Sequence, residues 1–266
     1  MTTRQLPIAE AHPRVTVRPS GRREVALLAA LLAAYSLVRA AAATDSAAAG
    51  RRADALLALE DRLGLSMERS VNAVVSEHAL LAVPFSYAYA GLHYVVTPAV
   101  LLLLWRRGAS AYVPARRSLV LMSALGLALF VALPTSPPRL LPDAGFVDTL
   151  AAWSAWGWWG DAASAPRGLG GLTNQYAAFP SLHVGWAVWC SLHWAATHRT
   201  HGHHAAAVAY SALIVLTVVA TGNHYVLDAV AGIALALGAH AAVTWPSSSP
   251  VLPASEGLSC GRPQAR

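Results

Sequence analysis

The chain has 266 residues, of which 56% are hydrophobic and only 12% charged, and its mean hydropathy is +0.45. A soluble protein of this length cannot bury that much apolar surface in one core. Two cysteines exclude a disulfide scaffold and a four-thiolate zinc site, and the long apolar runs exclude disorder over the body of the chain. The composition therefore predicts an integral membrane protein.

The net charge of +6 comes entirely from arginine, because none of the 19 basic residues is lysine. The arginines stand in short runs beside apolar stretches, as in Arg106-Arg107 and Arg116-Arg117. They are not clustered among aromatic residues, so we expect no nucleic-acid partner. Runs of this kind are typical of the cytoplasmic loops of membrane proteins, so the charge indicates topology.

Six apolar segments are long enough to cross a bilayer core of about 30 Å. With the N-terminus inside, twelve arginines fall on the cytoplasmic side and six outside, which favours cytoplasmic N- and C-termini. We therefore predict an all-α, polytopic membrane helix bundle over residues 25–245, between a mobile basic segment (1–24) and a mobile tail (246–266). The predicted spans are residues 25–44, 79–105, 118–134, 180–198, 205–221 and 224–245.

The first span has two interpretations. Its basic start, short apolar core and small residues resemble a cleavable signal peptide, whereas Arg39 interrupts the cleavage region and favours a retained anchor. Either way, residue 45 onward lies outside the cytoplasm. The next segment, 51–75, has leucines spaced among charges, which is typical of an amphipathic segment on the outer membrane surface. In the second span, His93 follows Tyr89 by one turn and either bonds a neighbouring helix or reaches the functional site.

After the third span, prolines end the helix and Arg139 follows them. The connection 135–178 is long for a helix loop and contains four of the nine tryptophans. Two interpretations fit this loop: an aromatic belt at the membrane interface, or a lid that admits a lipid headgroup. Four histidines between residues 198 and 204 match no standard metal site and lie on the predicted inner face, so we expect no metal.

The fourth and last spans each open with residues that carry chemistry. In Phe179-Pro-Ser-Leu-His183, free backbone N–H groups at a helix start make an anion site, to which Ser181 and His183 add polar side chains. His224 and Asp228 have i, i+4 spacing and share one helix face. The carboxylate can accept the Nδ1 proton and stabilise positive charge on the ring when Nε2 attacks an electrophile.

The predicted topology places Arg139, His183 and His224 at the same outer membrane face. A cation, an anion-binding helix start and a His–Asp pair suit phosphoryl transfer. The Pro-Pro-Arg139, Pro180-Ser-Leu-His183 and His224-x-x-x-Asp228 motifs, in this order, resemble the type 2 phosphatidic acid phosphatase superfamily of lipid phosphatases and phosphotransferases. The resemblance covers roughly residues 80–245.

This resemblance implies a mechanism without metal or cofactor at the extracytoplasmic face of the cell membrane. His224 would be the nucleophile that forms a phosphohistidine, Asp228 would orient it, and His183 would protonate the leaving oxygen. Ser181 and Arg139 would hold the phosphate. The candidate substrate pocket adds three further residues: Tyr89, His93 and Asn223.

The sequence also departs from the family pattern. Ala132 and Val218 stand where the family usually carries a Lys and an Arg. The missing cations and the segment leading to His93 are closest to the inositol phosphotransferase branch, which includes inositol phosphorylceramide synthase. Arg167, before the fourth span, is a candidate to supply phosphate-binding charge. Hydrolysis and transfer to an alcohol both stay open, and the alternative is a non-catalytic membrane scaffold or transporter that retains the fold.

Overall fold

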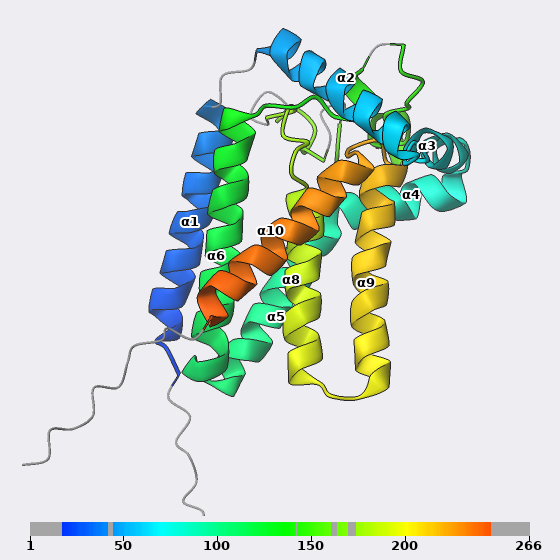
Figure 1. Ribbon diagram of the computed structural model, residues 1–266. Coiled ribbons are helices and arrows are strands. Elements are labelled where there is room, and N and C mark those ends of the chain that lie inside the picture. The colour runs from blue at the N-terminus through cyan, green and yellow to red at the C-terminus, as the bar shows by residue number, and fades with distance from the viewer. Residues whose placement is uncertain (1–17, 42–44, 142, 161–163, 170–173, 246–266) are drawn as a thin grey trace, which may run out of the picture.

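The computed structural model describes residues 18–41, 45–141, 143–160, 164–169 and 174–245. Within these ranges the chain forms helices joined by turns and isolated bridges, with no β-strand. The fold is thus an all-α helix bundle (Figure 1), as predicted. The predictions for residues 1–17 and 246–266 fall outside the described residues. The α-helices are α1 (Gly21–Ala41), α2 (Ser46–Leu63), α3 (Glu68–Glu77), α4 (Ala79–Tyr87), α5 (His93–Arg107), α6 (Ala109–Ala132), α7 (Thr149–Ala152), α8 (Leu182–Thr197), α9 (His201–Ala220) and α10 (Val226–Thr244).

Each of the six predicted spans contains a helix in its described residues. In the described part of the chain, four stretches are long and apolar enough to cross a membrane: Ala79–Arg107, α6, α9 and α10. The first of them joins α4 to α5 through a π-helical segment, Ala88–Leu92. Of the other two predicted spans, α8 has 16 residues, whereas an upright span needs about 20. The protein is therefore a polytopic membrane bundle.

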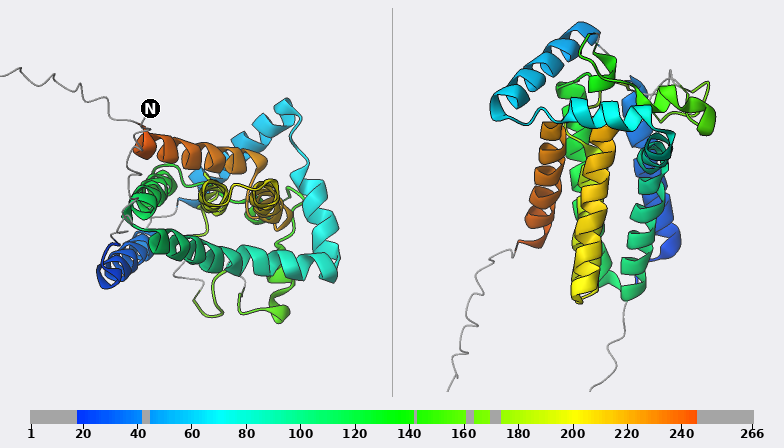
Figure 2. Two further views of the ribbon diagram at one scale, coloured as in Figure 1. Left: turned by 90° about the horizontal axis from the view of Figure 1, so that it is seen from below. Right: turned by 90° about the vertical axis from the view of Figure 1, so that its right-hand side faces the viewer.

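Helix α8 lies at the centre of the bundle, in contact with α5, α6, α9 and α10 (Figure 2). Its crossing with α10 depends on Gly232, because a Cβ there would lie 2.3 Å from the carbonyl oxygen of Ser181. Membrane helices commonly approach each other closely at such small residues. The backbone N–H of Ser181 also donates to the carbonyl oxygen of Asp228, at 3.0 Å. The start of α8 is thus fixed to the first turn of α10.

Helices α2 and α3 lie across one end of the bundle instead of along it (Figures 1 and 2). They correspond to the amphipathic segment predicted over residues 51–75. Helix α2 ends at Gly64, whose φ of 70° is a left-handed conformation that glycine adopts without strain. The long loop after α6 returns to the same end, where it forms the short helix α7. We call this the site end.

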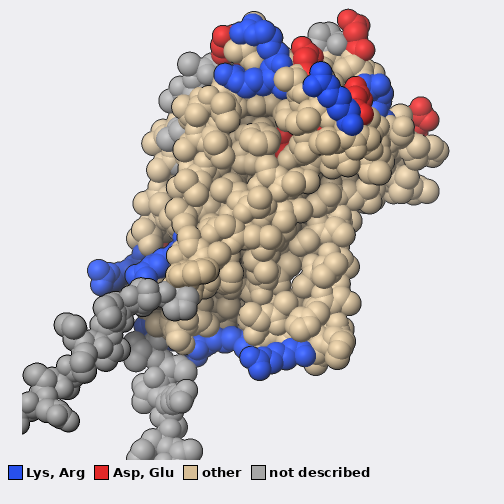
Figure 3. All heavy atoms as spheres, viewed as in Figure 1, with Lys and Arg blue, Asp and Glu red and all other residues tan. Residues whose placement is uncertain are grey.

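Charged side chains are segregated between the two ends. On the visible face, acidic and basic side chains both lie at the site end, arginines alone lie at the opposite end, and a wide uncharged band separates them (Figure 3). Near the opposite end, Glu24 of α1 pairs with Arg116 of α6, with Nη1 and Oε1 2.6 Å apart, and accepts the Tyr112 hydroxyl at 3.0 Å. These contacts fasten α1 to the bundle.

Candidate active site

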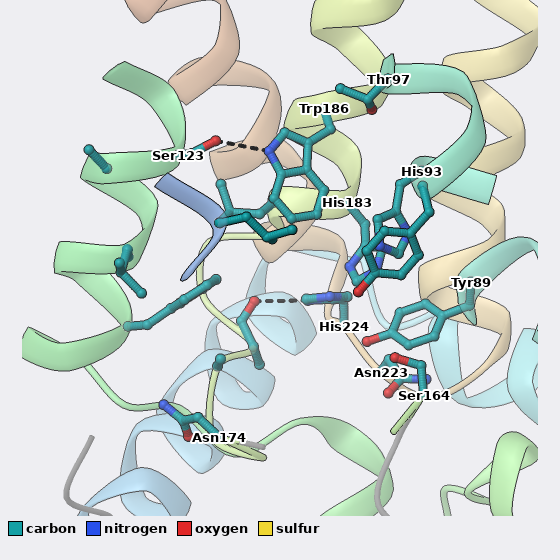
Figure 4. A pocket seen from close by; sticks show the side chains of 18 of the residues that line it. Tyr89, His93, Thr97, Ser123, Ser164, Asn174, His183, Trp186, Asn223 and His224 are labelled. Carbon is teal, nitrogen blue, oxygen red and sulfur yellow. Dashed lines mark hydrogen bonds between the residues drawn. The ribbon is translucent and has the colours of Figure 1, made fainter. Parts of the chain in front are cut away.

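Arg139, His183 and His224 line one cavity of about 450 Å³ at the site end of the bundle. Figure 4 shows the two histidines in it. Arg139 lies in a 3₁₀ turn, Pro138–Leu140, that follows α6. His183 is in the first turn of α8, and His224 immediately precedes α10. The three motifs converge because each stands at a helix terminus on the same side of the bundle.

His224 is held by its Nδ1 atom. This nitrogen lies 2.8 Å from the carbonyl oxygen of Ala178 and 3.4 Å from Oδ2 of Asp228. Both are acceptors, so Nδ1 carries the proton and Nε2 keeps its lone pair. Asp228 is fully buried, and its Oδ2 also accepts the Tyr225 backbone N–H at 2.9 Å. Sequence reasoning identified the Asp228 contact but missed the shorter one to Ala178, because it comes from a loop 46 residues away.

His183 faces the same cavity within an aromatic group. Its ring stacks on Tyr89, with centroids 4.4 Å apart, and lies edge-on to His93 at 4.7 Å. The His183 and His224 ring centroids are 6.0 Å apart, so both imidazoles can reach one bound group. Tyr89, His93 and Asn223, the three expected pocket residues, all line the cavity (Figure 4).

Arg139 is positioned by three hydrogen bonds. Its Nε donates to Asn223 Oδ1 at 3.0 Å, its Nη1 to Asp148 Oδ2 at 2.7 Å, and its backbone N–H to the Gly222 carbonyl at 2.9 Å. The Arg139 side chain is 1% exposed. Gly222 has φ 72°, and a Cβ there would lie 2.9 Å from the Val147 carbonyl oxygen. The guanidinium is therefore aimed at the cavity with its charge already paired to Asp148.

Asn72 of α3 holds the loop that carries Asp148. Its Oδ1 accepts the Val147 N–H at 2.7 Å, and its Nδ2 lies within 3.0 Å of the carbonyl oxygens of Val147 and Ala220. Asn72 is fully buried. The sequence did not reveal Asn72 or Asp148. Asn72 bonds residues more than 70 positions away, and Asp148 lies in a loop whose conformation the sequence does not predict.

Two expected phosphate-binding residues lie elsewhere. Ser181 is fully buried and caps α8, its hydroxyl 3.5 Å from the Val184 N–H, and it is not among the residues that line the cavity. Arg167 is exposed and donates to backbone carbonyls of its own loop, including those of Gly157 at 3.0 Å and Trp159 at 3.3 Å. Neither side chain is brought to the cavity, and Arg139 is the one arginine that lines it among the described residues.

The tryptophans of the long loop divide between its core and its surface. Trp159 is fully buried and donates from Nε1 to the Leu150 carbonyl at 2.8 Å. Trp156 and Trp158 are 60% and 44% exposed, and Tyr87 packs edge-on against Trp158. Trp159 therefore holds the loop together, while its exposed neighbours are available to the membrane interface.

No group of three or more His, Cys, Asp or Glu side chains that could hold a metal ion occurs among the described residues. The histidines near residues 198–204 lie at the opposite end of the bundle from the cavity, at the turn between α8 and α9. Three imidazoles, those of His93, His183 and His224, and the Arg139 guanidinium line the cavity, and the Asp228 carboxylate lies behind His224.

A comparison with known protein families agrees with the order of Arg139, His183 and His224 along the chain. A family model described as the PAP2 superfamily matches residues 54–242. The chain belongs to the PAP2 superfamily. Membership supports a phosphatase-type phosphoryl-transfer function in general, and the matched region contains every helix from α3 to α9 together with most of α2 and α10. No curated protein and no solved structure matches the chain.

Proposed function

We propose that this PAP2-superfamily protein is a metal-independent enzyme that transfers a phosphoryl or phospho-headgroup unit of a membrane lipid. The observation that carries the proposal is the single cavity onto which His183, His224 and Arg139 all open. The arginine-rich end of the bundle is the one predicted to face the cytoplasm, so the site lies at the extracytoplasmic face of the cell membrane.

In this proposal, Nε2 of His224 attacks the phosphorus and the bond to the leaving oxygen breaks, while His183 donates a proton to that oxygen. The positive charge on the His224 ring is stabilised by the Ala178 carbonyl and the Asp228 carboxylate. Arg139 stabilises the charge on the equatorial oxygens. His183 then takes a proton from water or an alcohol, which attacks the phosphorus and releases His224.

A lipid substrate is supported by the shape of the cavity. From the imidazoles it continues between α1, α5 and α6, where its walls are mostly aliphatic. An apolar passage that ends at a few convergent polar groups suits a molecule with an alkyl chain and a phosphate head. The aliphatic residues of the wall include Leu28, Leu31 and Leu32 of α1 and Leu119, Val120 and Leu127 of α6.

The charge balance supports a phosphodiester or headgroup-transfer substrate. A phosphate monoester carries close to two negative charges near neutral pH, whereas a diester carries one. The only arginine among the described cavity-lining residues is already paired with Asp148. Ala132 is exposed at the end of α6 and Val218 is fully buried, and neither lines the cavity. This charge balance supports our proposal that the protein is nearest the inositol phosphotransferase branch of the superfamily.

The test is turnover by the purified protein on a panel of phospholipids, with chelator present and with or without inositol. Product that carries inositol would identify transfer, and free phosphate or a free headgroup would identify hydrolysis. A matched His224→Ala protein controls for contaminating activity. Absence of turnover on every lipid, in protein shown to be folded, would favour the non-catalytic scaffold or transporter.

A further inference from the structure

Two glutamates of the helices across the site end are buried together. Glu60, in the last turn of α2, is 0% exposed, and Glu68, the first residue of α3, is 1% exposed. Glu60 Oε2 and both Glu68 oxygens are buried without a hydrogen-bond partner, and the neighbouring Glu68 carboxyl is one of the groups that raise the pKa of Glu60. Two ionised carboxylates buried side by side would repel each other. A proton on Glu60 removes this repulsion.

Glu60 also holds the first turn of α10. Its Oε1 accepts the backbone N–H of Leu227 at 2.6 Å. This N–H belongs to the second residue of the helix and has no partner within it. The neighbouring Tyr225 N–H is accepted by Oδ2 of Asp228 at 2.9 Å, and this same oxygen faces His224. The turn that carries the nucleophile is thus fixed by Asp228 from within and by Glu60 from α2.

We propose that Glu60, through its bond to the Leu227 N–H, is a positioning residue for His224. It fixes the start of α10 to the helix that lies across the site end. Neither glutamate lines the cavity, so the effect on chemistry passes through Asp228. The inference rests on the proposed role of His224 as the nucleophile.

The protonation of Glu60 depends on its surroundings. Burial, together with the neighbouring Glu68 carboxyl, raises the pKa of Glu60 from 4.5 to about 8. Above that pH, a second negative charge would appear beside Asp228 and push against the turn that Glu60 holds. The titratable or charged groups that face this cluster are Glu68 from α3, Asp54 from α2, and His224, Tyr225 and Asp228 at the start of α10.

The sign of the effect on stability follows from proton binding. Between about pH 4.5 and about pH 8, folded Glu60 keeps a proton that the unfolded chain has released. The free energy of unfolding therefore falls as pH rises through this window and levels off above it. Glu60→Gln cannot titrate, so its thermal midpoint should lose this part of the pH dependence.

Three variants test the proposal in the full-length protein. Glu60→Gln keeps an oxygen acceptor for Leu227 and stays neutral at every pH, so at about pH 6 its kcat should match the native value, and its activity should extend above about pH 8. Glu60→Leu leaves the Leu227 N–H buried without an acceptor, so kcat should fall about tenfold to a hundredfold with little change in KM. Glu77→Gln, on the exposed side of α3, should change neither.

Hydrogen–deuterium exchange provides a readout that does not depend on activity. The peptide that contains Leu227 should exchange faster in Glu60→Leu than in the native protein, and at the native rate in Glu60→Gln. Native kcat and native exchange in Glu60→Leu would overturn the proposal, and so would a Glu60→Gln variant as impaired as Glu60→Leu. A native protein without turnover would instead refute the proposed function, and exchange would still decide whether Glu60 holds α10. If Glu60→Leu does not fold, the pH dependence of Glu60→Gln decides.

Discussion

Removing the charge of Asp148 should shift the enzyme toward phosphate monoesters. Asp148 Oδ2 lies 2.7 Å from Arg139 Nη1, and its Oδ1 accepts the Ala151 N–H at 3.0 Å. The substitution Asp148→Asn keeps the shape of the side chain and one of its two oxygen acceptors, so it removes the charge at the loss of one hydrogen bond. With its counter-charge gone, Arg139 can offer a full positive charge to the substrate.

The size of the shift follows from Coulomb's law. A phosphate bound by Arg139 would lie about 7 Å from Asp148, and two unit charges at that distance interact by about 2 kcal/mol at an effective dielectric constant of about 20. A monoester dianion carries one more charge than a diester, so its relative kcat/KM should rise about thirtyfold. Asp148 is 17% exposed, and solvent screening makes this an upper value.

The assay is the ratio of kcat/KM for phosphatidate to that for phosphatidylinositol, in chelator, for the native protein and Asp148→Asn. Asp143→Asn is the control, because Asp143 is exposed in the same loop and its φ of 64° suits Asn as well as Asp. An unchanged or lower ratio in Asp148→Asn would refute the argument that missing positive charge sets the substrate preference.

His224→Ala should abolish turnover, and Asp228→Asn should lower kcat about a hundredfold or more, because the imidazole loses its counter-charge; near-native initial rates in either variant would contradict the mechanism. Chelators should leave turnover unchanged and vanadate should inhibit it, as a mimic of the transition state; turnover that stops in chelator would exclude this account. Gly232→Ala should cost about 1–3 kcal/mol of stability, because its Cβ would lie 2.3 Å from the Ser181 carbonyl oxygen. Gly238→Ala, which would meet nothing within 4 Å on the same helix, is the control, and equal thermal midpoints for the two would contradict the packing argument.

The all-α fold and the convergence of Arg139, His183 and His224 could be predicted from the sequence. Apolar length sets the helices, and arginine placement sets which ends face the same way. Each of the three motifs stands at a helix terminus. Because successive helices run through the bundle in alternating directions, these termini lie at the same end. Their approach to a common cavity therefore needed no knowledge of loop conformation.

Arg167 and Ser181 could not be placed from the sequence because local partners compete for them. Backbone carbonyls of a turn capture the Arg167 guanidinium, and the first turn of α8 uses the Ser181 hydroxyl as a cap. The amphipathic pattern of residues 51–75 predicts a surface position for its charged residues, and Glu60 is an exception because it is fully buried. A signal was present, since Glu60 falls three and four residues after Leu57 and Leu56, on the apolar face of that helix. Its partners Glu68 and Leu227 follow only from the tertiary structure.

The most direct test of the central claim is to trap the covalent intermediate. His183→Ala protein, which should release the second product slowly, is mixed with a phospholipid, quenched in alkali to preserve phosphohistidine, digested and analysed by mass spectrometry. The account predicts a phosphoryl or phospho-headgroup adduct on the peptide that carries His224, and its absence from the His183→Ala, His224→Ala double variant. Turnover by the native enzyme without any adduct on His224, or with an adduct on another residue, would contradict it.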